Sequence, residues 1–290
     1  MKPDISEKVF LLTGGTEGIG KAAATEFASR GADLTIVARN EAKAERVVSE
    51  LRKKTGNERV SYLLCDLSRM ADVKRVADDF RLRHNRLDVL VNNAGATLRE
   101  PMLGPDGIEL TFALNYLSHF LLTSSLLDLI RGTKNARVIS TSSAMQARGA
   151  LDLRTTPTSL APTGWRAYAT AKLAMILFTT ELQRRLAGST ATANCFEPGM
   201  VRTQFGGFGT DLGFLLNLVY LMARPFAKTP EQGADSLIWL ATSPEARELM
   251  GQYVSQRRPT VPAQQARDPD LAAQLWVTSE SLCVKALSST

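Results

Sequence analysis

Short apolar runs alternate with longer stretches of helical periodicity along the chain. The runs are rich in β-branched residues, as buried strands are, and they read VFLLT, LTIVA, VSYLLC, LDVLVNN, ARVIST and TATANCF. The helical patterns between them begin near Gly18, Glu41, Arg69, Gly107 and Trp165. Strands that alternate with helices favour right-handed crossovers and a parallel sheet covered on both faces. The pattern therefore predicts a three-layer, doubly wound α/β fold with about seven parallel strands.

The pattern continues after residue 200 with fewer elements. A helix is expected at 230–242, a short strand at 252–255 and a last helix at 268–282. No linker rich in proline or serine interrupts the alternation before residue 200. We therefore predict a single domain over residues 1–290.

Two segments fall outside the regular alternation. We interpret residues 200–228 as a substrate lid and residues 256–290 as a C-terminal extension. The lid contains the longest uncharged apolar run, LGFLLNLVYLMA at 212–223, which is shorter than the roughly 20 residues of a membrane-spanning helix. The run predicts either a buried or lid helix, or an apolar lid over a lipophilic substrate that also touches a membrane surface. The opening residues show no signal-peptide pattern, so we expect a cytoplasmic protein with at most peripheral membrane contact.

Composition narrows the function classes. Hydrophobic residues make up 44% and charged residues 22% of the chain, as in ordinary soluble domains. The three cysteines (Cys65, Cys195 and Cys283) lie far apart without a CxxC motif and there are two histidines, so neither a disulfide scaffold nor a metal site is expected. The net charge of +6 comes from basic residues interleaved with acids, which argues against nucleic-acid binding. Phosphorylated ligands and anionic lipid surfaces stay open as partners.

The first strand runs into a glycine-rich turn and then a helix, in the segment VFLLTGGTEGIGKAAATEFA. Gly14, Gly18 and Gly20 have the spacing GxxxGxG. In this pattern the first glycine permits a tight turn, the second lets the backbone approach a pyrophosphate, and the third allows close helix–strand packing. The helix N-terminus supplies unpaired N–H groups for the anion. Glycines also serve plain turns, but the order of strand, turn and helix predicts dinucleotide binding by a Rossmann-type fold.

The end of the second strand bears on which dinucleotide is bound. Enzymes that use NAD usually place an acid there, whereas this chain has Ala38 followed by Arg39, which suits a 2′-phosphate. A solvated arginine is the alternative, and Glu17 in the glycine-rich turn opposes phosphate binding. We therefore predict NADP(H), with NAD(H) as the alternative. Asp66, at the end of the third strand, is placed either to accept from the adenine amino group or to cap the next helix.

Tyr168 and Lys172, in WRAYATAKLAMILF, lie four residues apart and so on one face of a predicted helix. A phenol with its ordinary pKa of about 10 is a poor acid–base catalyst at pH 7. A neighbouring ammonium group favours the phenolate and lowers the pKa of the tyrosine, so that the pair can exchange protons with a carbonyl or an alcohol. The YxxxK pattern alone is weak evidence, and its context decides its meaning.

The motifs around this pair resemble those of the short-chain dehydrogenase/reductase family. TGGTEGIG, CDL, NNAG at 92–95, LNYLSHFLLT, STSSA, YATAK and PGMVRT occur in that family's order and spacing over roughly residues 5–255. The long interval between serine and tyrosine, with LNYLSHFLLT and LWVTSESL, is similar to the retinol-dehydrogenase-like branch. TGGTEGIG and LNYLSHFLLT are also similar to the branch that acts on polyprenols. Bacterial ketoreductases that tailor polyketides, anthracyclines included, share the pattern.

The resemblance implies an NADP(H)-dependent oxidoreductase that interconverts a ketone or aldehyde and an alcohol by hydride transfer. It implies Tyr168 as the proton donor and Ser143 as the donor that orients the carbonyl. It also implies that Lys172 holds the nicotinamide ribose, and that Asn115, at a bend in its helix, orders a water leading to the lysine. The implied cofactor-binding residues are Gly14, Thr16, Gly18, Ile19, Gly20, Arg39, Asp66, Leu67, Asn93, Ala94, Gly95, Tyr168, Lys172, Pro198, Gly199, Val201 and Thr203. Glu197 departs from the histidine that is frequent before the PGxxxT element in the retinol branch, so contacts there are expected to differ.

The substrate side is expected to be apolar. The predicted substrate-binding residues are Ser143, Met145, Trp165, Tyr168, Met200, Phe205 and Phe208. Such a wall suits a large lipophilic carbonyl, namely a retinoid or polyprenoid aldehyde, a steroid-like ketone or an aromatic polyketide such as an anthracycline. The alternative is that these side chains close the core or a subunit contact. Family members commonly associate through the helices that carry Asn115 and Tyr168, which implies a homodimer or tetramer.

Two other function classes stay open. A catalytically silent NADP(H)-binding regulator would keep the glycine turn but usually lose the tyrosine or the lysine, and both are present here. A nucleotide-sugar epimerase or dehydratase shares the serine, tyrosine and lysine. It normally has a different glycine spacing and a longer C-terminal substrate domain. Net consumption of the cofactor would separate an oxidoreductase from both.

Overall fold

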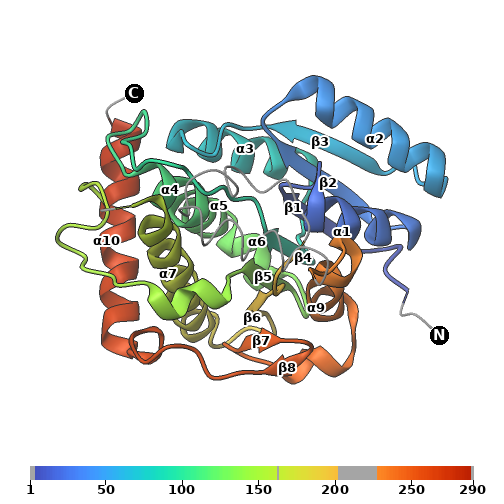
Figure 1. Cartoon of the computed structure of the whole chain (residues 1–290). Coiled ribbons are helices and arrows are strands. Elements are labelled where there is room, and N and C mark those ends of the chain that lie inside the picture. Colours follow the sequence, from blue (N-terminus) through green and yellow to red (C-terminus); the bar gives the residue numbers. More distant parts are fainter. Residues whose placement is uncertain (1–3, 162, 202–226, 289–290) are drawn as a thin grey trace.

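The computed structural model describes residues 4–161, 163–201 and 227–288. Within these ranges one eight-stranded sheet has the order β3-β2-β1-β4-β5-β6-β7-β8 (Figure 1). The strands are β1 (Val9–Thr13), β2 (Asp33–Ala38), β3 (Val60–Leu64), β4 (Val89–Asn92), β5 (Arg137–Thr141), β6 (Thr192–Glu197), β7 (Tyr253–Ser255) and β8 (Arg258–Pro259). Neighbouring strands are parallel from β3 to β7, which confirms the predicted doubly wound sheet.

The strand β8 is the difference from the sequence prediction. It consists of Arg258 and Pro259, which are both exposed, and it pairs antiparallel with β7 at the edge of the sheet. The two residues between these strands, Gln256 and Arg257, have positive φ angles of 49° and 61°, as a tight two-residue hairpin requires. Because β8 buries no side chain, it leaves no hydrophobic signal in the sequence.

Helices cover both faces of the sheet. The longer ones are α1 (Gly18–Ser29), α2 (Glu41–Thr55), α3 (Met70–Arg83), α5 (Ser118–Ser125), α7 (Gly164–Arg185), α9 (Pro230–Thr242) and α10 (Pro269–Ser288). The shorter ones are α4 (Leu110–Phe112), the π-helical turn η1 (Ala113–Leu117), α6 (Leu127–Gly132) and the 3₁₀ turns η2 (Ala144–Arg148), η4 (Glu245–Glu248) and η5 (Gln265–Arg267). The helix starts predicted at Gly18 and Glu41 coincide with α1 and α2, and the range predicted at 230–242 coincides with α9.

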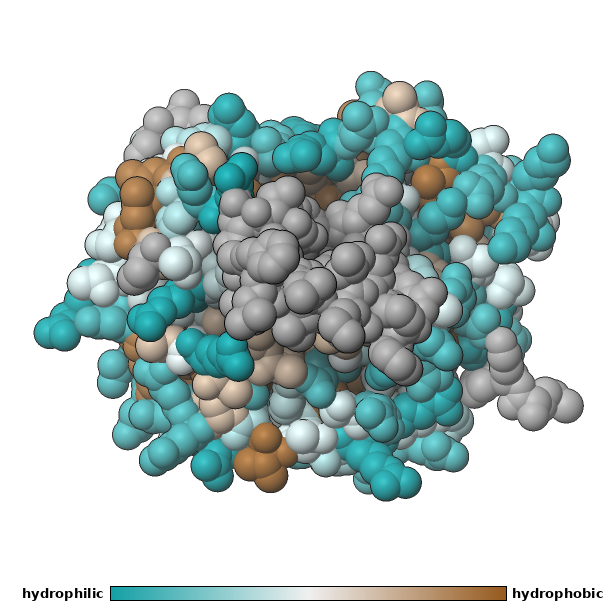
Figure 2. Space-filling view, in the orientation of Figure 1, coloured by the Kyte–Doolittle hydropathy of each residue, from teal (hydrophilic) through white to brown (hydrophobic). Residues whose placement is uncertain are grey.

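Alternate strand residues face two different helical layers. Leu11 of β1 lies in the apolar cluster formed with α3, α5, α7 and α10, whereas its neighbour Leu12 lies in the cluster formed with α1, α2 and α9. Both side chains are fully buried, as expected for a parallel sheet covered on both faces. The described residues on the face in Figure 2 are mostly hydrophilic, with some apolar residues among them.

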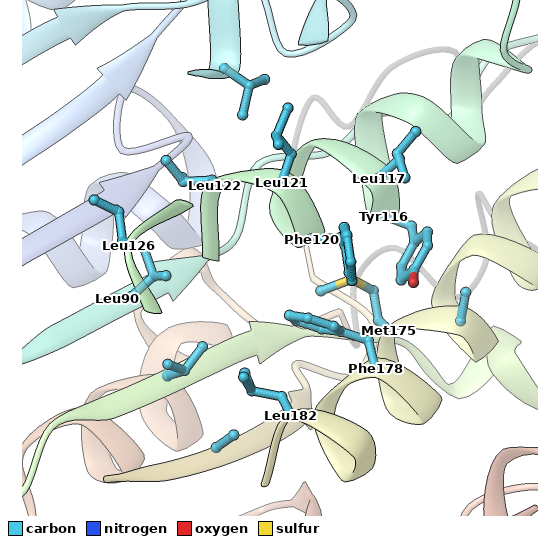
Figure 3. Packing of buried hydrophobic residues seen from close by; sticks show 14 of the residues in the cluster. Leu90, Tyr116, Leu117, Phe120, Leu121, Leu122, Leu126, Met175, Phe178 and Leu182 are labelled. Carbon is cyan, nitrogen blue, oxygen red and sulfur yellow. The ribbon is translucent and has the colours of Figure 1, made fainter. Parts of the chain in front are cut away.

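The C-terminal helix α10 belongs to the core. Its buried residues repeat at helical spacing and are Ala272, Leu275, Trp276, Ser279, Cys283 and Ala286. The ring centroid of Trp276 lies 4.9 Å from that of Phe120 in α5 and 5.9 Å from that of Phe178 in α7. Figure 3 shows Phe120, Met175 and Phe178 next to one another in the same apolar cluster, and the ring centroids of Phe120 and Phe178 lie 5.9 Å apart. The segment predicted as a C-terminal extension therefore covers the outer side of α7 and packs on α5 (Figure 1).

The candidate site lies at the carboxyl ends of the central strands. β1 has β2 on one side and β4 on the other. The chain leaves β1 toward the layer of α1, and it leaves β4 toward the opposite layer, which contains α5. In doubly wound sheets, ligands bind in the crevice that forms at such a change of direction.

Part of the predicted lid lies outside the described residues. This part includes the apolar run at 212–223 and the predicted contacts Thr203, Phe205 and Phe208. Within the described ranges, no helix combines the length and the apolar character needed to cross a membrane.

Candidate functional site

The glycine-rich turn between β1 and α1 leaves no room for a side chain at Gly14 or at Gly20. Gly14 has a φ of +73°, and a Cβ there would stand 2.8 Å from the Cα of Ala94. A Cβ on Gly20 would stand 2.1 Å from the carbonyl oxygen of Gly14. Gly18 opens α1, whose N-cap residue Glu17 makes no side-chain capping hydrogen bond. Thr16 lies in the turn and Ile19 in the first turn of α1. Together these segments present the first N–H groups of α1 to a ligand, which fits a pyrophosphate.

Thr13, the last residue of β1, ties this turn to the loop after β4. Its hydroxyl accepts from the backbone N–H groups of Asn93 (2.9 Å) and Ala94 (3.0 Å) and donates to the carbonyl of Val91 (3.2 Å). The side-chain amide of Asn93 donates to the Thr13 carbonyl at 3.1 Å. Sequence reasoning missed Thr13, whose one signal is its position between an apolar strand and a glycine turn. Its hydrogen bonds hold the predicted cofactor loop against the turn.

Two cations stand near the end of β2, where a 2′-phosphate was predicted. Arg39 follows β2 directly and is exposed. Lys43 lies in the first turn of α2, where its backbone N–H is capped by Asn40 (2.9 Å) and its ammonium group contacts the Glu17 carboxylate at 2.5 Å. Glu17, which opposed the NADP(H) prediction, is thus paired with a cation. Sequence reasoning missed this pair because its partners are 26 residues apart.

Asp66 orders the turn that leads into α3. Its Oδ1 accepts from the backbone N–H (3.0 Å) and the hydroxyl (2.7 Å) of Ser68. The backbone N–H of Asp66 donates to the carboxylate of Asp72 in α3 (3.1 Å). Leu67 packs against the apolar cluster that contains α3. The capping alternative for Asp66 is wrong: the N-cap residue of α3 is Arg69, and the Met70 N–H donates to the carboxylate of Asp106 instead.

Ser143, Tyr168 and Lys172 come together at the carboxyl end of β5. On α7, the Lys172 ammonium lies 5.4 Å from the centroid of the Tyr168 ring and donates to the carbonyl of Thr141 at 3.0 Å. Tyr168 is hydrogen-bonded to Ser143. The Ser143 oxygen accepts from the backbone N–H of Met145 (3.2 Å), so its own hydrogen stays available as a donor.

Burial sets the protonation of Tyr168 and Lys172. Burial raises the pKa of the Tyr168 phenol to about 12, against a smaller lowering by the hydrogen bond with Ser143. Burial lowers the pKa of Lys172 to about 7. The expectation that the ammonium group lowers the pKa of the tyrosine is therefore wrong, because both groups lose water and the lysine is only partly charged at pH 7. Tyr168 is a neutral phenol at that pH, which is the form that donates a proton.

Asn115 lies in the π-helical turn η1, where the family resemblance implies a bend. Its side-chain nitrogen donates to the carbonyls of Ala96 (2.7 Å) and Thr111 (2.9 Å). Its Oδ1 is buried and has no hydrogen-bond partner among the described residues. A Cβ on Gly95 would stand 2.4 Å from this oxygen and 3.6 Å from the Lys172 ammonium. An acceptor beside the lysine that lacks a protein partner fits the ordered water that the resemblance implies.

The PGxxxT element follows β6, and its first part is described. Gly199 has a φ of +76°, and the carbonyl of Pro198 accepts from the Lys228 ammonium at 3.2 Å. Val201 pairs with Lys228 in an isolated bridge, which brings the two ends of the predicted lid together. Pro198, Gly199 and Val201 therefore lie at the base of that segment.

Glu197, the residue in place of the frequent histidine, joins the ends of β6 and β7. Its two carboxylate oxygens accept from the hydroxyls of Tyr253 (2.9 Å) and Ser255 (2.8 Å). Burial and the nearby carboxylate raise the pKa of Tyr253. Glutamate at this position, in place of the histidine, therefore joins β6 to β7 at the edge of the site.

The described substrate-side residues lie on η2, on α7 and in the segment after β6. Met145 belongs to η2, Trp165 to the first turn of α7, and Met200 follows β6. Met200 is 53% exposed, so part of this wall is an apolar surface in the described structure.

Known proteins resemble the chain over most of its length. The short chain dehydrogenase family profile matches residues 8–208. Human polyprenol dehydrogenase is 36% identical over 286 residues, covering 96% of this chain and 85% of that protein. Human retinol dehydrogenase 13 is 33% identical over 291 residues, covering 97% of this chain and 86% of that protein.

Solved structures resemble it as well. A protein from Mycobacterium paratuberculosis has a TM-score of 0.77 at 29% identity, covering 98% of this chain and 96% of that one. RhlG of Pseudomonas aeruginosa was solved as an active-site complex with NADP. It has a TM-score of 0.70 at 25% identity, and the match covers 88% of this chain and 97% of that one. The likeness therefore extends across the sheet and both helical layers.

Proposed function

Because this chain belongs to the short-chain dehydrogenase family and is an oxidoreductase, we propose that it interconverts a lipophilic ketone or aldehyde and the corresponding alcohol with NADP(H). The observation that carries the proposal is the convergence of Ser143, Tyr168 and Lys172, with Asn115 across Gly95, at the carboxyl end of β5. The bound nicotinamide would supply or accept the hydride. The protein supplies the proton and the geometry.

In the reductive direction Tyr168 protonates the carbonyl oxygen. Its raised pKa keeps the phenol neutral, and thus able to donate, at pH 7. Ser143 donates a hydrogen bond to the same oxygen as negative charge develops on it. Lys172, whose pKa of about 7 lets it gain and lose a proton near neutrality, returns a proton toward Tyr168. The free Asn115 oxygen holds the water that connects this lysine to solvent.

We assign NADP(H) as the preferred cofactor from Arg39 and Lys43. The two side chains lie on consecutive parts of the β2–α2 junction, and a 2′-phosphate there would compete with Glu17 for the Lys43 ammonium. Several structural neighbours, RhlG among them, were solved with NADP or NADPH. Two cations at this junction support NADP(H), because its extra phosphate would gain from them and NAD(H) has no such group.

Replacing Arg39 with serine should weaken NADPH binding by about 10- to 100-fold, since a hydrogen bond to a charged group contributes about 1.5–3 kcal/mol. The affinity for NADH should change less than about threefold, because NADH lacks the phosphate. Fluorescence titration of each cofactor measures both. Lys54→Ser, an exposed cation at the other end of α2, is the matched control and should leave both affinities unchanged. An equal loss for NADH and NADPH in Arg39→Ser would argue against this assignment.

The substrate we propose is large and lipophilic. The support is the apolar character of Met145, Trp165 and Met200 together with the names of the relatives, which are a polyprenol and a retinol dehydrogenase. Initial rates of NADPH consumption with retinal, a steroid ketone, an anthracycline ketone and a small sugar ketone would test it. At least one lipophilic carbonyl should exceed the sugar ketone by about tenfold or more in kcat/KM, given the size of apolar discrimination in pockets. Preference for the sugar ketone would refute a lipophilic substrate.

Any homodimer or tetramer of this chain would, we propose, use a surface other than α5 and α7. Family resemblance predicts association through those two helices. In this chain α10 already packs on them, with the Ser279 and Tyr116 hydroxyls 2.7 Å apart and the Arg185 guanidinium 4.3 Å from the centroid of the Trp276 ring. A second subunit could reach that face only after α10 had left it.

A further inference from the structure

His119 is a buried histidine with one ring nitrogen unused. It lies on α5, one turn after Asn115, and is 1% exposed. Its Nε2 lies 2.8 Å from the carbonyl oxygen of Ala94. A carbonyl only accepts, so Nε2 carries the hydrogen and Nδ1 is an acceptor. Nδ1 has no hydrogen-bond partner among the described residues, and burial lowers the pKa of the ring to about 4, so it is neutral at pH 7.

Two further polar atoms without partners in the described part of the chain lie on the strands that α5 covers. They are Oδ1 of Asn92 and the hydroxyl oxygen of Ser140, and both residues are almost completely buried. Asn92 of β4 and Ser140 of β5 are register partners, so their side chains point to the same face of the sheet. The Asn92 amide donates to the hydroxyl of Thr123 at 3.0 Å, which places that face against α5. Since Thr123 is one turn after His119, their side chains lie on the same side of α5, and the three atoms belong to one buried layer between α5 and the sheet.

Their chemistry is complementary to a water molecule. Asn92 Oδ1 and His119 Nδ1 each need a donor, and the Ser140 hydroxyl can donate as well as accept. One water donates twice and accepts at least once, so it satisfies all three, and about three hydrogen bonds is the usual number for a buried water. Leaving three such atoms unpaired in the core is costly compared with holding one water.

We propose that Asn92, Ser140 and His119 bind one internal water molecule, and that His119 is a positioning residue that connects this water to the Ala94 carbonyl. Ala94 and Gly95 lie between the glycine-rich turn and the catalytic lysine. This loop is tightly packed on both sides. A Cβ on Gly14 would stand 2.8 Å from the Cα of Ala94, and a Cβ on Gly95 would stand 2.4 Å from the Asn115 oxygen. A fixed His119 ring therefore fixes the loop that borders the cofactor. The water site is independent of the proposed function, whereas the effect on catalysis rests on it.

Two variants of His119 separate its two contacts. In His119→Gln, the amide nitrogen of the new side chain can still donate to the Ala94 carbonyl, but no acceptor remains at the Nδ1 position. The shorter side chain in His119→Asn keeps a polar atom near the Nδ1 position and loses the bond to Ala94. We expect His119→Asn to weaken NADPH binding by about tenfold, in the range of one lost hydrogen bond, and His119→Gln to weaken it by less than about threefold. Fluorescence titration measures both without any substrate.

Nuclear magnetic resonance of ¹⁵N-labelled histidine tests the water site directly. The wild-type ring should be the neutral Nε2–H tautomer down to pH 5, and the Nδ1 resonance should shift in Ser140→Ala, which removes one partner of the water but not the Ala94 bond. A crystal structure should show the water within hydrogen-bond distance of all three atoms. An Nδ1–H tautomer, or a Ser140 hydroxyl bonded directly to Nδ1, would overturn the water site. Equal NADPH affinities in His119→Asn and His119→Gln would overturn the positioning role, whatever substrate the enzyme has.

Discussion

Phenylalanine in place of Tyr168 is expected to lower kcat by about a hundredfold to ten-thousandfold, which is the usual contribution of a positioned general acid. The substitution removes only the hydroxyl, and with it the proton that the carbonyl oxygen receives. Tyr168 is buried beside Lys172 and hydrogen-bonded to Ser143, so no solvent molecule replaces the lost donor at the same place. The rate of NADPH consumption with a lipophilic carbonyl substrate measures the loss.

Cofactor affinity distinguishes this loss from a damaged site. NADPH binding to Tyr168→Phe should stay within about threefold of the wild type, because the glycine-rich turn and Arg39 are untouched. Tyr62→Phe removes a phenol on β3, away from the catalytic group, and should leave both kcat and affinity unchanged. Normal turnover in Tyr168→Phe would refute the assignment of the proton donor, and a lost affinity for NADPH would mean that the variant acts through the cofactor site.

Alanine in place of Trp276 is expected to lower the free energy of unfolding by about 3–5 kcal/mol, the usual cost of removing a large buried aromatic side chain. The Trp276 side chain is 2% exposed. It packs against Phe120 and Phe178, carries the Arg185 guanidinium over its ring and donates from Nε1 to Glu280 at 2.7 Å. A loss of this size is a large part of the free energy of unfolding of a typical domain, which is roughly 5–15 kcal/mol. Urea denaturation followed by circular dichroism measures it.

The neighbouring residue provides the control. Val277 is on the same helix and 60% exposed, so Val277→Ala should change the unfolding free energy by less than about 1 kcal/mol. The contrast tests whether α10 is part of the core or a loosely attached extension. If Trp276→Ala also cost less than about 1 kcal/mol, α10 would not contribute to the stability of the domain in the way its packing indicates.

The start of the helix that carries Asn115 shows where sequence patterns lose precision. The periodicity predicts a helix from about Gly107, but the helix begins at Leu110. Gly107 has a φ of +69° and lies in a turn closed by the bridge between Leu103 and Glu109. Apolar spacing does not distinguish a turn followed by a helix from a slightly longer helix. The bend at Asn115 was implied by resemblance, and the structure shows it as a π-helical turn.

The sequence by itself determined the order of strands and helices, the glycine-rich turn and the spacing of Tyr168 and Lys172. Each of these depends on residues that are close together in the chain, so local periodicity and φ preferences are sufficient to predict them. The family assignment follows from the same motifs and is confirmed by the relatives.

Only the tertiary structure decided how these parts interact. The pairing of Glu17 with Lys43, the hydrogen bonds of Thr13 and the place of α10 on α7 all join residues that are far apart in the chain. The direction of the Tyr168 pKa also needed the fold. The spacing of Tyr168 and Lys172 predicted that the lysine charge lowers the pKa of the tyrosine. Burial instead removes water from both side chains and raises the pKa of Tyr168. Burial is a property of the packed chain, and no local pattern contains it.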